Sequence, residues 1–180
     1  DYRGGSNSRK TTILNVLADF IPKTGRVITI EDSAELQIHG IENLVRMEVR
    51  QADGDGVSNV TLRDLIRTSL RMRPDRIIVG EVRGEEALDM IQSMNTGHDG
   101  SLSTGHANSP QDMLSRLETM ALFASDIPIQ AIRKQIASSI DIIVQLERLR
   151  DRSRRVTAIA EVLDCTEDAY ILNPIFEFHE

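Results

Sequence analysis

At the start of the chain a glycine-rich turn runs directly into an apolar-periodic segment, and this pair narrows the possible folds sharply. The turn and the first residues after it are Gly4, Gly5, Ser6, Asn7, Ser8, Arg9, Lys10, Thr11 and Thr12. Apart from one position, their spacing is G-x-x-x-x-G-K-[ST], that of a loop whose backbone N–H groups surround a phosphate. The following helix, predicted over residues 10–20, would point its positive end at the same anion. The pattern therefore predicts a nucleotide-binding α/β fold.

Within this loop, Lys10 is expected to bridge the β- and γ-phosphates, and Thr11 to hold Mg²⁺ through its hydroxyl group. The usual glycine before the lysine is Arg9 in this chain. A side chain costs about 1–2 kcal/mol if that position is left-handed, and more if it meets the nucleotide. Arg9 therefore predicts weakened nucleotide binding. Taken alone, the segment would fit equally well a glycine-rich turn that caps a helix beside a chance Lys-Thr pair.

Two apolar segments that read as buried strands each end in acidic residues. Residues 26–30 (RVITI) precede Glu31 and Asp32, and residues 76–80 (RIIVG) precede Glu81. Phosphoryl transfer to water needs a bound metal and a carboxylate that orients the water, usually at the ends of strands beside the phosphate loop. The sequence predicts that Glu31 and Glu81 share these two roles, and it does not assign the base between them.

The order of the remaining segments predicts the architecture. Helical and strand-like patterns alternate up to about residue 140, and three strand-like segments follow, over residues 141–147, 155–163 and 169–178. This order favours an α/β core with a mostly parallel twisted sheet flanked by helices, and antiparallel strands near the C-terminus. We expect one nucleotide-binding domain over residues 1–180, with an N-terminal domain of the parent protein missing.

Composition excludes several classes of protein. The net charge of −7 disfavours a sequence-independent nucleic-acid binder, which needs a surplus of Lys and Arg. The single cysteine, Cys165, allows no disulfide within the chain and no zinc site built from cysteines. No apolar run approaches the roughly 20 residues of a membrane span. These features favour a reducing, cytoplasmic setting, with membrane association only through a partner.

A stretch with two histidines, residues 96–110 (TGHDGSLSTGHANSP), is the most distinctive part of the chain. His98 and His106 suggest a metal site at first sight. A structural zinc site needs four ligands, however, and neither a cysteine nor a third histidine is near. A metal site of that kind is therefore not expected.

Four segments together resemble the type II/IV secretion ATPase family, most closely its Flp/Tad pilus-assembly branch. They are the altered phosphate loop, IEDSAEL at 30–36, LRMRPDRIIVGEVRG at 70–84 and the histidine segment at 96–110. These resemble the family's P-loop, Asp box, Walker B and His box, and the likeness spans nearly the whole chain. The last two segments are highly specific in combination. The tetra-cysteine zinc insertion of the type II branch is absent from the sequence.

The resemblance implies a RecA-like P-loop NTPase core that uses ATP and Mg²⁺ and works as a homohexamer. It further implies a place on the cytoplasmic face of the inner membrane, where ATP turnover drives a platform protein that assembles pilin or exports substrate. No direct contact with nucleic acid is expected.

By position in the motifs, Lys10 and Thr11 match the P-loop, with Thr11 and Glu81 at the metal. The residues expected to act in catalysis are Glu81, Glu31, His106 and Arg83. His106 would sense the γ-phosphate, and His98 lies in the same motif. Arg46, Arg50 or Arg83 would reach a phosphate, or would form ordinary salt bridges.

Two other readings stay open. Arg9 favours a nucleotide-impaired, non-catalytic ring subunit as the alternative to an ATP-hydrolysing motor. A DNA-strand motor would share the fold, but the acidic balance and the lack of an aromatic platform disfavour it. The basic segment 148–155 (RLRDRSRR) is expected to form a solvated hairpin, or to contact an acidic partner or a membrane surface.

Overall fold

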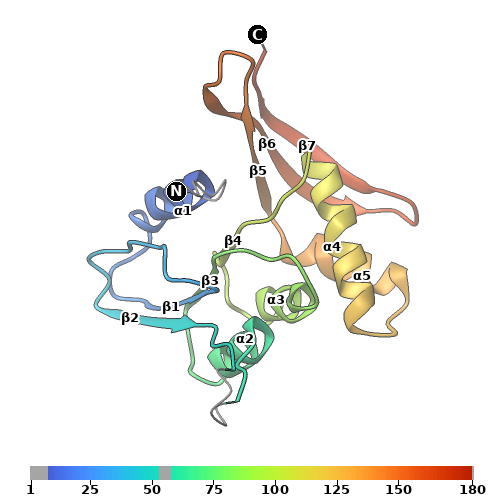
Figure 1. The fold of residues 1–180 in the computed structure, drawn as a ribbon. Helices are drawn as coiled ribbons and strands as arrows, with labels where there is room; N and C mark the ends of the chain where they lie inside the picture. Colours follow the sequence, from blue (N-terminus) through green and yellow to red (C-terminus); the bar gives the residue numbers. More distant parts are fainter. Residues whose placement is uncertain (1–7, 53–57, 180) are drawn as a thin grey trace. The chain divides into compact units, whose positions relative to one another are not determined.

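The computed structural model describes residues 8–52 and 58–179 and divides into two compact units (Figure 1). Unit 1 comprises residues 1–82 and 97–104, and unit 2 comprises residues 83–96 and 105–180. The predicted fold class is confirmed, because a parallel sheet with helices is followed along the chain by an antiparallel sheet. That all 180 residues form one nucleotide-binding domain stays a prediction.

Unit 1 is built on a four-stranded sheet in the order β2-β1-β3-β4. Its strands are β1 (Arg26–Glu31), β2 (Asn43–Glu48), β3 (Arg76–Val79) and β4 (Leu102–Ser103). Every neighbouring pair is parallel, and the central strands β1 and β3 are almost wholly buried, as expected for a parallel sheet covered on both faces. The carboxyl ends of parallel strands meet at one edge, which brings the residues that follow β1 and β3 together.

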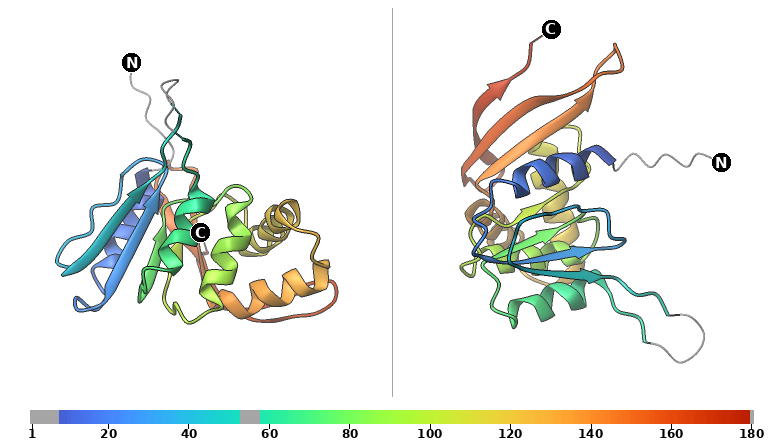
Figure 2. Two further views of the ribbon diagram at one scale, coloured as in Figure 1. Left: turned by 90° about the horizontal axis from the view of Figure 1, so that it is seen from below. Right: turned by 90° about the vertical axis from the view of Figure 1, so that its left-hand side faces the viewer.

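Two helices cover the opposite faces of this sheet (Figure 2). Helix α1 (Ser8–Ala18) buries Leu14 and Ala18 in a core cluster that includes Val27 of β1 and Ile78 of β3. Helix α2 (Leu62–Leu70) buries Leu65 and Ile66. Its first turn is closed by a capping box between Thr61 and Asp64, and the hydrogen bond from the Thr61 side chain lowers the pKa of Asp64.

Unit 2 combines three helices with an antiparallel sheet in the order β5-β6-β7. The helices are α3 (Glu86–Met94), α4 (Pro110–Ala124) and α5 (Ile129–Ser139), and the strands are β5 (Ile142–Arg148), β6 (Arg154–Cys165) and β7 (Tyr170–Glu177). Helix α4 begins with a capping pattern that can be read in the sequence: Ser109 accepts a hydrogen bond from Asp112 N, and Pro110 lies in the first turn. Within the described residues, no helix is both long and apolar enough to cross a bilayer.

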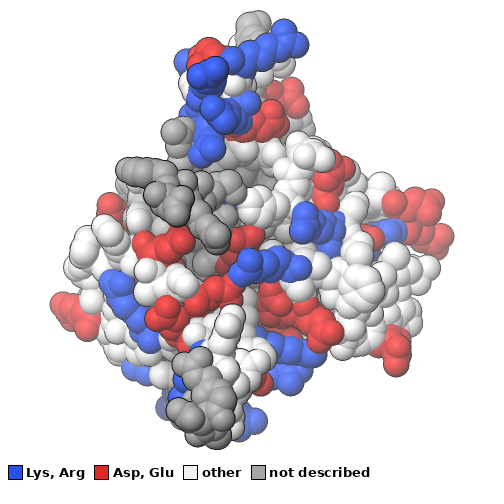
Figure 3. Space-filling view, viewed as in Figure 1, with Lys and Arg blue, Asp and Glu red and all other residues white. Residues whose placement is uncertain are grey.

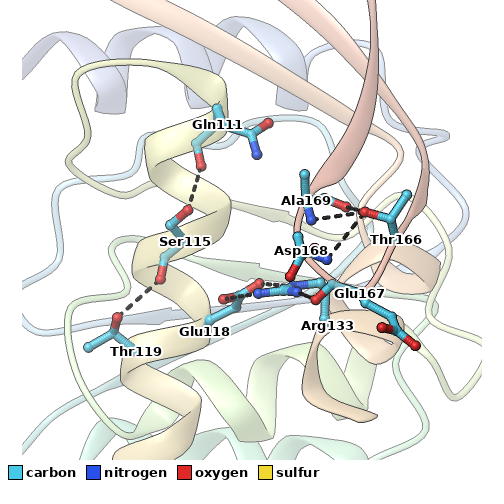
Figure 4. A network of polar contacts seen from close by, with 9 residues as sticks. All are labelled: Gln111, Ser115, Glu118, Thr119, Arg133, Thr166, Glu167, Asp168 and Ala169. Carbon is cyan, nitrogen blue, oxygen red and sulfur yellow. Dashed lines mark hydrogen bonds and ion pairs between the residues drawn. The ribbon is translucent and has the colours of Figure 1, made fainter. Parts of the chain in front are cut away.

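A largely buried ion pair joins α4, α5 and the β6–β7 turn inside unit 2 (Figure 4). Arg133 donates to both carboxylate oxygens of Glu118, at 2.6 and 3.2 Å, and also to the backbone carbonyl of Glu167. The turn itself is closed by Thr166, whose hydroxyl oxygen accepts from the backbone amides of Asp168 and Ala169. Arg133 thus connects the helices to the sheet through charge-assisted hydrogen bonds.

Candidate nucleotide site

The first turns of α1 bring a hydroxyl group to a carboxylate. Thr11 Oγ1 donates a hydrogen bond of 3.1 Å to Oε2 of Glu35, which lies in the loop after β1. Thr11 is half-buried and Glu35 is exposed. Hydroxyl and carboxylate oxygens are ligands that Mg²⁺ accepts, and Mg²⁺ takes only one or two of them from the protein when phosphates complete its shell. These two residues therefore fit the predicted metal.

The carboxylate of Glu31 is buried and is oriented by the backbone that follows it. Its Oε1 atom accepts hydrogen bonds from the amides of Glu35 and Leu36, both at 3.0 Å. The residue as a whole is 6% exposed. Hydrogen bonds from N–H groups to a carboxylate are about twice as strong as neutral ones. Glu31 therefore holds the start of the Glu35 loop in place, in addition to any chemical role.

The loop at residues 34–38 is also held from two other elements. From β2, Arg46 donates to the carbonyl groups of Leu36 and Ile38, at 2.8 and 3.0 Å. From α1, Asn15 Oδ1 accepts from the amide of Gln37 at 2.9 Å. The guanidinium of Arg46 is thus bound to backbone carbonyls. Its predicted contact with a phosphate stays a prediction.

Glu31 also lies against Gly80, the last residue of the segment that precedes Glu81. A Cβ atom at Gly80 would come within 3.1 Å of Glu31 Cγ, and Gly80 N donates to Ile30 O at 2.9 Å. Thr104 fixes this segment from the β4 side, because its hydroxyl donates to Gly80 O at 2.6 Å and its carbonyl accepts from Val82 N at 2.8 Å. The Glu31 side chain therefore packs against the residue that directly precedes Glu81.

The first half of the histidine segment is attached to the start of β3. Gly100 has a φ of +76°, and its carbonyl accepts from Arg76 Nη1 at 3.1 Å. Ser101 Oγ accepts from Ile77 N at 3.1 Å and donates to His98 O at 2.7 Å. These contacts fix the backbone at His98 in unit 1, at the end of β3 opposite to Gly80.

The other predicted catalytic residues, Arg83 and His106, belong to unit 2. Arg83 N donates to Glu86 Oε1 at 2.8 Å, which helps to begin α3. The carbonyl of His106 accepts from Arg116 Nη1 at 2.9 Å. Their approach to the nucleotide stays a prediction. Arg50 donates to Ser58 O at 3.3 Å, and its predicted phosphate contact stays a prediction as well.

Part of the phosphate loop lies outside the described residues, namely Gly4, Gly5, Ser6 and Asn7. The backbone of Arg9 is described and is helical, in the first turn of α1. The cost of a left-handed conformation therefore does not arise at this residue. Whether its side chain weakens nucleotide binding stays a prediction.

Sequence reasoning missed Glu35 as a candidate and did not foresee the carbonyl contacts of Arg46. Glu35 lies four residues after Glu31 in the IEDSAEL segment, which resembles the family's Asp box. Its place in that segment is the sequence feature that could have marked it as a site residue. Its distance to Thr11 depends on the path of an irregular loop, which no periodic pattern encodes.

Comparison with known proteins identifies the family. A family model described as Type II/IV secretion system protein matches residues 3–171. The type IV secretion system protein PtlH of Bordetella pertussis is 36% identical over 155 residues, covering 84% of this chain and 46% of PtlH. The chain therefore spans less than half the length of this curated relative.

Two solved structures are similar in fold. The VirB11 ATPase of the Brucella suis type IV secretion system, in complex with sulphate, is 32% identical with a TM-score of 0.76, over 87% of this chain and 46% of that chain. The Legionella pneumophila ATPase DotB, 23% identical with a TM-score of 0.57 over 84% of this chain and 41% of that chain, supports the fold alone. The family model covers nearly the whole chain, PtlH is similar to the chain in sequence, and VirB11 is similar to it in sequence and fold. The chain therefore belongs to the type II/IV secretion system ATPase family.

Proposed function

We propose that this chain is the ATP-hydrolysing motor domain of a secretion or Flp-type pilus-assembly ATPase. The observation that carries the proposal is the contact between Thr11 and Glu35, because it places the hydroxyl of the phosphate-loop helix beside the carboxylate-bearing loop that follows β1. The sulphate bound to the similar VirB11 ATPase supports an anion site in this fold.

In this proposal, Lys10 and the helix N-terminus bind the phosphates, and Thr11 with Glu81 holds Mg²⁺. Bound Mg²⁺ would neutralise charge that develops on the phosphate oxygens. Glu35, by its position at Thr11, is a third carboxylate for orienting water or metal. Glu31 has one oxygen engaged with two backbone amides, which favours an orienting role for it and leaves general-base work to Glu35 or Glu81.

The larger assembly is also a proposal. The parent protein would form a homohexameric ring at the inner membrane and act on a platform protein. Arg83 and His106 would report phosphate loss or act across a subunit boundary. These elements follow from the family resemblance.

The test is Mg²⁺-dependent ATPase activity of the full-length parent protein. Lys10→Ala, Glu35→Gln and Glu81→Gln are each expected to lower the turnover rate by about 10²–10⁴-fold. Glu42→Gln is the matched control, because Glu42 is an exposed acid of the same unit that lies in the turn just before β2. Activity that is independent of Mg²⁺, or equal in Lys10→Ala and Glu42→Gln, would contradict the motor.

Arg9→Gly separates the motor from the nucleotide-impaired ring subunit. The motor with a weakened loop predicts tighter ATP binding in Arg9→Gly than in the wild type, with activity in both. The hypothesis of a nucleotide-impaired ring subunit predicts ATPase activity only in Arg9→Gly. If Arg9→Gly also lacks Mg²⁺-dependent ATPase activity, the proposal of an ATP-hydrolysing motor is wrong. Equally tight ATP binding by the wild type and Arg9→Gly would exclude any impairment by Arg9.

A further inference from the structure

The turn between β5 and β6 carries a dense group of exposed arginines, which Figure 3 shows as blue side chains over this turn. They are Arg148, Arg150, Arg152, Arg154 and Arg155. We call residues 148–155 the arginine hairpin. It contains one acid, Asp151, whose Oδ1 accepts from Ser153 N at 2.8 Å. With five arginines and one aspartate the hairpin carries +4, so the rest of the −7 chain carries −11.

The fold keeps these charges together at a local cost. Arg148 and Arg154 are directly paired across the two strands, and like charges in that relation destabilise a sheet. Arg152 has a φ of +67°, a left-handed conformation that favours glycine or asparagine. Neither feature helps the hairpin to fold. A bound external anion would offset the repulsion between the paired arginines.

The β5-β6-β7 sheet, which includes the arginine hairpin, also exposes apolar side chains. Val144, Ile159 and Phe176 form one row across β5, β6 and β7, and Val144 and Phe176 are 37% and 43% exposed. Nearer the turn, the Arg155 guanidinium lies over the Phe178 ring, 5.3 Å from its centroid. Nucleic acid is bound through its phosphates and by stacking of its bases on aromatic rings, and the exposed aliphatic side chain of Val144 adds to neither contact. A lipid interface takes both basic and apolar side chains.

We propose that the arginine hairpin binds the anionic headgroups of a lipid bilayer, with the Val144–Ile159–Phe176 row at the headgroup boundary. Arginine suits this ligand because its planar fork pairs with phosphate oxygens. The acidic remainder of the chain is repelled by the same surface, so the charge distribution orients the protein with the hairpin toward the lipid. The proposal goes beyond the proposed function, in which membrane association runs through a partner, and it requires no nucleotide.

The experiment is co-sedimentation of the purified parent protein with phosphatidylcholine vesicles, with and without phosphatidylglycerol, in the absence of ATP. Wild-type protein is expected to bind only the anionic vesicles, and less at high salt. Arg152→Gly is expected to weaken binding about fivefold while leaving the thermal midpoint unchanged or higher, since it removes the strained φ. Arg150→Gln with Arg152→Gly is expected to weaken binding about 25-fold.

The matched control is Arg71→Gln with Lys134→Gln, which removes two exposed charges elsewhere and is expected to leave vesicle binding unchanged. Equal binding to neutral vesicles, unchanged binding in the hairpin variants, or equal loss in the control would overturn the proposal. So would a preference of the hairpin for duplex DNA or polyglutamate over anionic vesicles, tested by competition. ATPase activity measured on the same variants keeps this result separate from that of the motor, because the hairpin variants are expected to retain it in solution.

Discussion

The side chain of Glu31 lies against the backbone of Gly80, so closely that a methyl group at residue 80 would come within 3.1 Å of Glu31 Cγ. Glu31 ends β1, and Gly80 follows β3. The lack of a side chain at residue 80 is therefore what allows the Glu31 carboxylate to reach the amides of Glu35 and Leu36.

Gly80→Ala is expected to displace Glu31 and to lower ATPase turnover by about 10- to 100-fold, because small misplacements of positioned groups are costly. Gly25→Ala is the control, since a Cβ there meets only ordinary contacts at 3.6 Å. Steady-state ATPase kinetics of both variants would check this prediction, and thermal melts would show whether each variant is folded. A variant that melts like the wild type and keeps full activity would show that Glu31 needs no such placement.

Arg46→Gln is expected to release the carbonyls of Leu36 and Ile38 and so loosen the loop that bears Glu35. If Arg46 acts through the loop, kcat falls while KM for ATP changes little. If it binds a phosphate in the ground state, KM rises instead. Measuring both constants, with Arg71→Gln as the control, distinguishes the two roles, and a rise in KM alone would count against the loop.

Gly100→Ala is expected to destabilise the fold more than Gly97→Ala. Both glycines have a positive φ, so alanine costs about 1–2 kcal/mol at either position. Only at Gly100 would the added Cβ also overlap the guanidinium of Arg76, whereas nothing lies within 4 Å at Gly97. Urea unfolding of the two variants gives the comparison. An equal loss of unfolding free energy in Gly100→Ala and Gly97→Ala would mean that the Arg76 side chain moves aside at no energetic cost.

Glu118→Gln is expected to cost about 3 kcal/mol near neutral pH, because it leaves the guanidinium of Arg133 without its charged partner. Burial alone would raise the pKa of Glu118, but the hydrogen bond from Arg133, the Tyr170 side chain and the charge of Arg133 together outweigh it and lower the pKa. The stabilisation is therefore fully present above the ordinary glutamate pKa of 4.5 and is lost as the pH falls through the lowered pKa of the folded state.

Melting curves of the wild type and of Glu118→Gln across this range check the prediction. The difference between the two midpoints is expected to shrink as the solution becomes more acidic. Gln111→Ala is the control on the same helix, since the Gln111 contact that Figure 4 shows is made by its backbone carbonyl. A constant difference at all pH values would contradict the role of the ion pair.

Much of the fold follows from the sequence because the deciding patterns are local. Apolar runs at 26–30 and 76–80 become the buried strands β1 and β3 within a residue or two. Ser109 and Pro110 begin α4 as the capping pattern predicts. The secretion ATPase family is also accessible from the sequence, because its motifs follow one another in order along the chain.

The contacts of the site were less accessible. Glu35 meets Thr11 through an irregular loop, and Arg46 turns its guanidinium to carbonyl groups ten and eight residues earlier in the chain. Such pairs depend on the tertiary path of the backbone, which spacing and periodicity do not describe. The basic run at 148–155 was visible in the sequence, but the direct pairing of Arg148 with Arg154 required the register of β5 and β6.

The loop at residues 34–38 has consequences for communication inside unit 1. It is attached to α1 through Asn15 and to β2 through Arg46, and its amides end on Glu31. If phosphate binds at the N-terminus of α1 as proposed, a resulting shift of α1 would reach the carboxylate at the tip of β1 through this loop. Filling of the phosphate loop and alignment of the acidic residues would then change together, as one coupled event.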